Sequence, residues 1–390
     1  MNKKMSLRPT SAYAGEIKPL LPARAFEPAH SRLLWLPLHV ACIAFSLSAI
    51  AGGWLAVPWF PVVSLLIGAS FAGLVFLGHE TLHGAVVRSR PLRHLVGWVG
   101  FLPFAVSPRL WVAWHNRVHH GNANHPGRDP DAYPTLHEYR KNPVVRFSLD
   151  WFGIGRRKLR GALSLLVGFS IQSAHQLLIA RRERYLSRRE FVLACVETGV
   201  GVALFAAALV WLGPLGFLFG CVLPVLVANA IVMAHILTNH SLSPHTEVND
   251  PLANSLSVSV PRVVEFLTLG FGFHVEHHLF PWMSARHGPV VRDLLRARYP
   301  ERYQSLPLLR AIWRVHQTPR VYASPHLLYD PKSGELAATL GPPPASPLTD
   351  DEPRTARHPN AITLRRGFAA EVAAGPSPRR ARVRRTRAAP

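Results

Sequence analysis

Two long stretches of the chain are almost free of charged residues, and each is divided near its middle by residues that favour a turn. The first runs from Leu33 to Gly78 and contains no Lys, Arg, Asp or Glu. As a single helix it would extend about 69 Å, roughly twice the hydrocarbon thickness of a bilayer. Gly52-Gly53 and Pro58 interrupt it, because glycine and proline favour turns and helix starts. The pattern predicts two helices, over residues 33–53 and 59–78.

The second stretch, from Phe191 to Thr238, carries only Glu197 and His235 as ionisable residues. Gly213-Pro214 divides it into expected helices over 191–212 and 214–237. Each of the four helices is long enough to cross a bilayer, and uncharged runs of this length are rare in soluble proteins. The pattern therefore predicts an all-α integral membrane protein, with four transmembrane helices in two hairpins.

Two further apolar segments are less suited to crossing a membrane. Leu95–Ser107 is too short to span, which favours a re-entrant or interfacial segment. Gly161–Ala180 is long enough, but polar residues such as Gln172 and His175 interrupt it and basic residues flank both ends. That pattern predicts a helix lying in the plane of the lipid headgroups.

Charge supports one orientation in the membrane. The chain of 390 residues has 44 Lys and Arg against 22 Asp and Glu, a net charge of +22. The two turns expected on the outer side, 52–58 and 213–216, contain neither Lys nor Arg. The positive-inside rule then places both termini and the long loops in the cytoplasm. Because the basic residues form no compact module, we expect no nucleic-acid partner.

The chain divides into three regions. Residues 1–30 have no apolar core that would make a signal peptide, so they are expected to be a cytoplasmic N-terminal arm. Residues 31–325 form the membrane domain. Residues 335–390 are rich in Pro, Ala and Arg with little periodicity, which predicts a disordered basic tail.

Eight of the 21 histidines form three clusters, which we call boxes one, two and three. The boxes are His79-Glu-Thr-Leu-His83, His115-Asn-Arg-Val-His119-His120 and His274-Val-Glu-His277-His278. Each box follows an even number of predicted spans, so all three should meet on the cytoplasmic side. The expected architecture therefore includes a cytoplasmic helical cap that carries the boxes.

The spacing within the boxes is typical of metal ligands. Positions i and i+4 share one face of a helix, so His79 with His83, and His115 with His119, can each converge on an ion. Adjacent residues diverge by about 100°, so the extra histidine of each HH pair can face a second ion. Zinc normally takes four ligands, whereas eight imidazoles indicate two ions, and imidazole suits iron.

In order and spacing, the three boxes with their hydrophobic hairpins resemble the membrane fatty acid desaturases and their hydroxylase relatives, over about residues 30–320. The resemblance implies a non-haem di-iron centre that activates O₂. Carried over residue by residue, it implies the iron ligands His79, His83, His115, His119, His120, His274, His277 and His278.

Family members usually supply one more histidine from the stretch before box three. His240 is the preferred candidate, because it lies just past the end of the fourth predicted span, and His235 is the alternative. Relatives often place an asparagine four residues before this histidine, but position 236 is Ile236 here. Asp129 and Asp131 follow box two and are expected either to orient ligand imidazoles or to form a loop turn.

The resemblance also implies the reaction and its partners. We expect an O₂-dependent fatty acid desaturase with no catalytic side chain beyond the metal ligands. It would act on an acyl chain carried by CoA, a carrier protein or a membrane lipid. Two irons and O₂ would do the chemistry, because no side chain removes hydrogen from unactivated methylenes by acid–base catalysis. The chain has no haem domain and no CxxC pair, so a separate donor of ferredoxin, rubredoxin or cytochrome b5 type must supply electrons.

Three other functions compete with desaturation. A hydroxylase or ketolase could use the same two irons on an alkyl, sterol or carotenoid substrate. Box one also satisfies the HExxH pattern, in which Glu80 would be the general base of a zinc protease within the membrane. That hypothesis leaves boxes two and three unexplained. The third alternative is a membrane protein that binds metal without catalysing a reaction.

Overall fold

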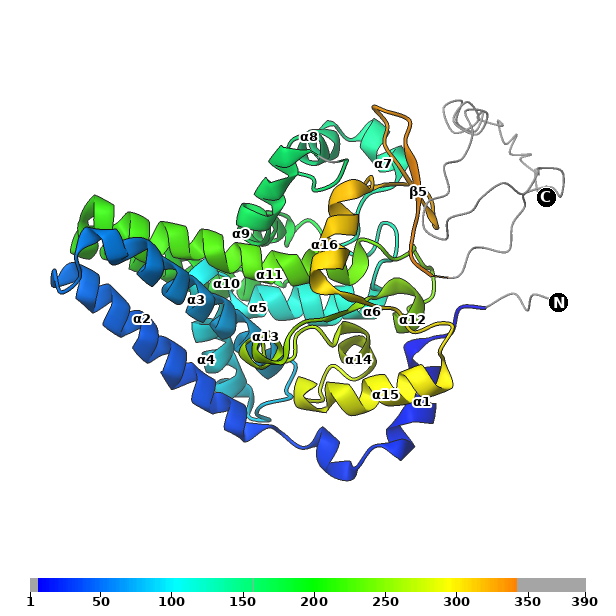
Figure 1. The fold of residues 1–390 in the computed structure, drawn as a ribbon, viewed down its shortest axis with the longest axis horizontal. Helices are drawn as coiled ribbons and strands as arrows, with labels where there is room; N and C mark the ends of the chain where they lie inside the picture. Colours follow the sequence, from blue (N-terminus) through cyan, green and yellow to red (C-terminus); the bar gives the residue numbers. More distant parts are fainter. Residues whose placement is uncertain (1–5, 157, 342–390) are drawn as a thin grey trace, which may run out of the picture.

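The computed structural model describes residues 6–156 and 158–341. Most of these residues are helical (Figure 1). The α-helices are α1 (Thr10–Ile17), α2 (Trp35–Ala51), α3 (Phe60–Leu82), α4 (Arg90–Phe101), α5 (Pro108–Trp111), α6 (His120–Asn122), α7 (Leu136–Lys141), α8 (Pro143–Trp151), α9 (Leu163–Ile179), α10 (Arg188–Phe217), α11 (Leu223–His240), α12 (Pro251–Asn254), α13 (Arg262–Leu267), α14 (His274–Leu279), α15 (Gly288–Arg298) and α16 (Leu308–Gln317). Two π-helices are η6 (Val112–His119) and η8 (Leu218–Val222). The 3-10 helices are η1 (Lys18–Leu20), η2 (Ala23–Phe26), η3 (His30–Leu34), η4 (Val57–Trp59), η5 (Leu102–Phe104), η7 (Leu159–Ala162) and η9 (Ala285–His287). The strands are β1 (Ser257–Ser259), β2 (Ser305–Pro307), β3 (Val321–Ser324), β4 (Leu327–Tyr329) and β5 (Leu336–Ala338).

Helix α3 is the centre of the helical bundle and is buried along most of its length. Three of its glycines allow neighbouring helices to come close. A Cβ atom added at Gly68 would lie 2.6 Å from Val227 of α11, and one at Gly73 would lie 2.2 Å from the ring of His39 in α2. Close approach through small residues is how helices associate in a membrane. This tight packing brings box one, at the C-terminal end of α3, close to the neighbouring helices.

Four stretches among the described residues are long and apolar enough to cross a membrane: His30–Ala51, Val57–Leu82, Leu159–Ile179 and Arg188–His240. The last contains Gly213 in a non-helical conformation, with φ 67° and ψ 173°, where the sequence predicts a division. The stretch Leu159–Ile179 satisfies the length and composition of a span, although its sequence was expected to lie in the headgroup plane. That placement stays a prediction.

The short apolar segment before box two is bent. The helices over Arg90–Phe104 and Pro108–Asn122 meet at an angle of 100°, as in a broken span or a re-entrant loop. Glu197 of α10 holds this bend in place, because its carboxylate accepts hydrogen bonds from Ser107 Oγ at 2.5 Å and Arg109 Nε at 2.8 Å. Glu197, the charged residue of the second apolar stretch, thus stabilises the bend before box two.

The N-terminal arm is an integral part of the structure. Tyr13 and Ile17 of α1 are buried against Val275 of α14 and Leu295 of α15, and Figure 1 shows α1 beside α15. The backbone N–H of Thr10 also donates to the carbonyl of Asn249 at 3.0 Å. The arm therefore covers the helix that carries box three.

Strand β5 corrects the expected start of the disordered tail. It pairs with β4 in an antiparallel three-stranded sheet of order β3-β4-β5. Beyond it, the N–H of Leu340 donates to the carbonyl of Leu242 at 2.6 Å. Disorder was expected from residue 335 because composition alone does not reveal strand pairing with a distant segment. The rest of the expected tail, 342–390, lies outside the described residues.

Candidate metal centre

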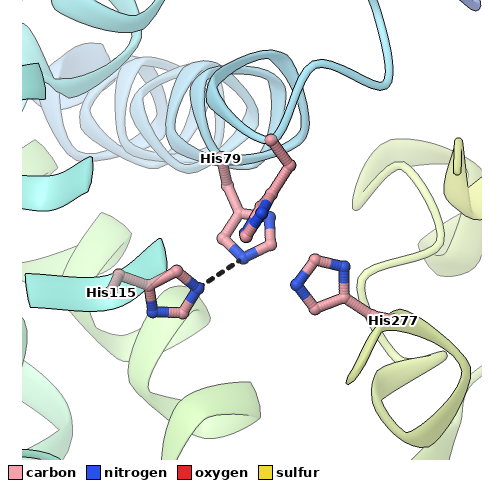
Figure 2. A group of neighbouring side chains, drawn as sticks. His79, His115 and His277 are labelled. Carbon is pink, nitrogen blue, oxygen red and sulfur yellow. Dashed lines mark hydrogen bonds between the residues drawn. The ribbon is translucent and has the colours of Figure 1, made fainter. Parts of the chain in front are cut away.

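The ends of four helical segments bring the histidine boxes together. Figure 2 shows His79 of α3, His115 of η6 and His277 of α14 converging from three directions. The Nε2 atoms of His79 and His115 are 3.2 Å apart. These residues come from segments far apart in the sequence, so the centre is assembled by the packing of the helices.

The ring nitrogens form two groups, in each of which the potential ligand atoms lie within 4.8 Å of one another. Group one consists of His79, His83, His115 and His277, and group two consists of His119, His240, His274 and His278. Two imidazole nitrogens bound to one ion at about 2.1 Å lie roughly 3.0–3.4 Å apart. The 2.8 Å between Nε2 of His274 and Nε2 of His240 is close to that separation.

His120 lies between the two groups. Its Nε2 atom is 3.1 Å from Nε2 of His277 in group one. Its ring stacks on that of His278 in group two, with centroids 4.3 Å apart. All nine histidines named from the sequence thus lie in one cluster, and their role as ligands stays a prediction.

Box two is divided between the two groups. His115 belongs to group one and His119 to group two, although i and i+4 positions were expected to share an ion. Both residues nevertheless lie on one side of the π-helix Val112–His119, where their rings stack with centroids 5.0 Å apart. His115, His119 and Asp131 also lie close enough to form a third possible set. The adjacent His277 and His278 face different groups, as the geometry of an α-helix predicts.

The two candidates for the ninth histidine have different surroundings. His240 donates through Nδ1 to the carbonyl of Asn254 at 2.8 Å, and its Nε2 atom faces His274. His235 lies one turn earlier in α11, and its Nδ1 atom contacts the carbonyl of Ile231 within the same helix. His240 therefore belongs to group two and His235 to neither group.

The Asp-Pro-Asp segment after box two contacts one of the histidines directly. Oδ1 of Asp129 lies 2.9 Å from Nδ1 of His119, and Oδ2 accepts from the backbone N–H of Asn124 at 2.6 Å. Burial alone would raise the pKa of Asp129, but the neighbouring His119 lowers it below its ordinary value. Asp131 accepts hydrogen bonds from Trp114 and Gln172, and burial together with the charge of Asp129 raises its pKa to about 6. The segment therefore both orients a histidine and shapes the loop.

The cluster has the properties of a metal site. Nε2 of His83 and both ring nitrogens of His278 are buried without a hydrogen-bond partner among the described residues. Such unsatisfied groups are costly unless something else binds them. Burial also lowers the pKa of His277 to about 3, so its imidazole is neutral, which is the form that binds metal. The residues present therefore fit two metal ions.

Glu80 does not face the cluster as a general base would. Its Oε1 atom accepts hydrogen bonds from Ser284 Oγ at 2.6 Å and from the N–H of Ala285 at 2.9 Å. The guanidinium of Arg32 lies 3.1 Å from Oε2. Both carboxylate oxygens thus hold neighbouring segments together, which argues against the zinc protease.

The acidic residue of box three, Glu276, was not singled out from the sequence. It is buried, and it accepts hydrogen bonds from Tyr303 at 2.5 Å and Ser257 at 2.6 Å. Burial raises its pKa. The contacts fix α14 between His274 and His277. In the sequence, the signal for this role is an acidic residue inside a histidine box, because its partners lie 19 and 27 residues away along the chain.

A cavity of about 280 Å³, lined by residues of α3, α9 and α11, reaches the histidines. Five of the cluster's histidines line one part of it, and most of the remaining lining is apolar. Among these residues are Phe101, Trp111 and Phe169, together with Val232 and Met233 of α11. The arrangement can hold a hydrocarbon chain against a metal centre.

Comparison with known proteins identifies similar sequences. The sequence model of a family described as "Fatty acid desaturase" matches residues 53–308. The chain is 27% identical to the sn-1 acyl-lipid omega-3 desaturase (ferredoxin) of Synechocystis sp., over 78% of this chain and 88% of that protein. It is 23% identical to the sn-1 oleoyl-lipid 12-desaturase of the same organism, over 66% of this chain and 74% of that protein. It is 22% identical to the chloroplastic omega-6 fatty acid desaturase of Spinacia oleracea, over 67% and 58%.

Proposed function

The chain belongs to the fatty acid desaturase family and is an oxidoreductase, and we propose that its substrate is the acyl chain of a membrane lipid. The proposal of an acyl-chain substrate rests on the apolar cavity that ends at the histidine cluster. The acyl-lipid desaturases among the relatives support a lipid rather than CoA or a carrier protein as the carrier.

We further propose that the nine clustered histidines hold two iron ions. Groups one and two each bind one ion, and His120 lies between them. When bound, the irons supply the O₂ activation that dehydrogenation of an unactivated chain requires. The reaction removes one hydrogen atom from each of two adjacent methylenes and reduces O₂ to two waters. Two further electrons and two protons must therefore come from outside.

The protein's own residues orient the ligands and hold the substrate. Asp129 accepts from Nδ1 of His119, and the carbonyl of Asn254 accepts from Nδ1 of His240, so that Nε2 is the remaining nitrogen for a metal in each ring. Phe101 and Phe169 with Met233 surround the path of the chain. Their positions relative to the histidines would select the methylenes that react.

For the membrane arrangement we propose two helical hairpins with the boxes in a cytoplasmic cap. The close approach of the Phe205 and Phe217 rings, 6.4 Å between centroids, supports a reversal of the chain at Gly213. The absence of Lys and Arg from the turns 52–58 and 213–216 supports their outer location. This arrangement needs an even number of spans before box three. Helix α9 therefore lies along the cytoplasmic headgroups and does not cross the membrane.

A separate protein would deliver the electrons. The ferredoxin in the name of the Synechocystis omega-3 desaturase supports a donor of the ferredoxin type. Electron delivery by a soluble donor also agrees with a centre on the cytoplasmic side.

Mass spectrometry of lipids tests the proposed function. The chain is expressed in a host that makes few fatty acids, and acyl lipids are compared with those of a host carrying His277→Ala. We expect new acyl chains that lack two hydrogens. Chains that instead gain one oxygen would favour the hydroxylase, and unchanged lipids with normal protein and iron levels would refute the proposal.

A further inference from the structure

A groove of about 1000 Å³ lies beside the metal centre, between η6, α7 and the loop before α10. Ala132, Tyr133 and Pro134 line both this groove and the apolar cavity. This short segment is therefore a wall common to the two spaces. Substrate in the cavity and a partner in the groove could approach the histidines at the same time.

The groove and the surface beside it carry a net positive charge. Its exposed cationic lining residues are Arg117, Arg128, Lys141 and Arg184. Further exposed arginines lie in the adjacent loop and at the start of α10: Arg181, Arg182, Arg188 and Arg189. Three acidic residues also line the groove: Asp129 is buried against His119, Glu138 caps α7 through Thr135, and Glu183 lies 3.6 Å from Arg182. Among the cations, Arg117 lies 3.9 Å from Glu190. The surface therefore favours a negatively charged partner.

The groove leads directly to a ligand of the proposed metal centre. Asp129 lines it, and the Oδ1 atom of this buried residue is 2.9 Å from Nδ1 of His119. His119 belongs to group two. One carboxylate and one imidazole ring thus connect the groove with the metal position, so a redox group bound there would be close to the centre.

We propose that this groove is the docking site of the electron donor, a small soluble redox protein with an acidic face. The inference rests on the proposed function, which requires two electrons from outside for each double bond. Electron-transfer complexes are small and weak, and charge complementarity provides their speed of association. The groove offers such charge beside a short route to the metal.

The lining of the groove favours a protein over a membrane surface. Besides its charges it contains polar residues such as Asn122, His137 and Asn142. Surfaces that rest on a bilayer combine basic residues with exposed apolar anchors. Anchors of that kind, Phe147 and Trp151, occur on the neighbouring helix α8 and do not line the groove.

The test uses the full-length iron-loaded protein in nanodiscs and a [2Fe–2S] ferredoxin with an acidic face. The variant Lys141→Glu/Arg184→Glu reverses two charges of the groove away from the histidines. The control Arg24→Glu/Arg298→Glu makes the same change of net charge at two exposed residues of η2 and α15. Figure 1 shows α15 and α7 at opposite sides of the cap.

We expect the groove variant to raise both the Kd and the KM for ferredoxin by about tenfold or more at low salt. Added salt should weaken binding to the wild type and have little effect on the groove variant. The control should bind like the wild type. A groove variant that binds ferredoxin like the control would overturn the proposal, as would one that loses only its affinity for anionic vesicles.

Reduction by dithionite separates docking from chemistry. Protein reduced in this way and then exposed to O₂ should give the wild-type yield of product in one turnover for both variants, since no donor is needed. A loss of this yield in the groove variant would show damage to the centre and refute the docking role. If even the wild type gives no product, the proposed function fails, while the ferredoxin Kd still decides the docking site.

Discussion

The Oδ1 atom of Asp129 lies 2.9 Å from Nδ1 of His119, an arrangement that leaves Nε2 of the imidazole as the nitrogen available to a metal. Carboxylates that orient metal-binding histidines in this way typically change metal affinity or activity 10–100-fold when removed.

Asp129→Asn should lower iron affinity by about 10–100-fold with the protein still inserted in the membrane, because the amide cannot hold the histidine as the charged carboxylate does. Iron per chain by elemental analysis at graded iron concentrations measures the effect. The control Glu183→Gln changes an exposed acid of the same groove that contacts no histidine of the cluster among the described residues. Equal iron binding by Asp129→Asn and the wild type would contradict an orienting role.

His240→Ala should abolish the product and lower bound iron, whereas His235→Ala should keep most of both. The reason is that Nε2 of His240 faces His274 in group two, while His235 contacts the backbone of its own helix. Losing a direct ligand should cost at least the 10–100-fold of an orienting residue. Product and iron are measured together for the two variants. The opposite order of effects would show that His235 is the ligand.

The essential histidines separate the desaturase from the zinc protease. His79→Ala, His119→Ala and His277→Ala should each abolish product and lower bound iron, because all three belong to the proposed ligand groups. A zinc protease would need His79 and His83 but has no evident use for His119 or His277. After removal of metal by a chelator, Fe²⁺ should restore desaturation and Zn²⁺ should not. One zinc per chain and a fully active His277→Ala protein would overturn the assignment.

Glu80→Gln should reduce stability more than it reduces chemistry. The carboxylate joins Ser284 and Arg32 across the structure, and removing one partner of a buried ion pair typically costs about 3–5 kcal/mol. We expect a lower temperature of irreversible unfolding, with iron content retained in the protein that stays folded. Activity per bound iron distinguishes the outcomes, since a general base would be needed even in the fully folded protein.

Two truncations test where the structured part of the chain ends. A chain ending at Gly341 retains β5 and should make product at the wild-type level. A chain ending at Gly334 lacks β5 and should be less stable, because Leu327–Tyr329 loses one of its two pairing partners. Protein level and lipid product are compared for both. If the chain ending at Gly341 loses activity at a normal protein level, the segment beyond 341 contributes to the site or to donor binding.

Cysteine labelling tests the membrane arrangement. After replacement of the three native cysteines, a probe at position 55 or 214 should react with a reagent outside the cell, and a probe at 125 or 285 should not. Outside labelling at 285 would contradict two hairpins with α9 on the cytoplasmic surface and would indicate an odd number of spans before box three.

Local patterns in the sequence already determined the main elements. Uncharged runs interrupted by glycine and proline placed the long helices α2, α3 and α11, and Gly213 interrupts the helical conformation where the pattern divides the second run. The spacing of His79 and His83 correctly brought both into one group. These features follow from helix geometry and the cost of charge in hydrocarbon, both of which act on residues close together in the chain.

The tertiary structure decided how the histidines are divided and supported. The division of His115 and His119 between the two groups, and the contact of His240 with His274, are not encoded in the spacing of the boxes. The hydrogen bond from Tyr303 to Glu276 and the pairing of β5 with β4 join segments that no local pattern relates. Periodicity specifies which side of a helix a residue occupies, but only the packing of distant segments determines what lies opposite that side.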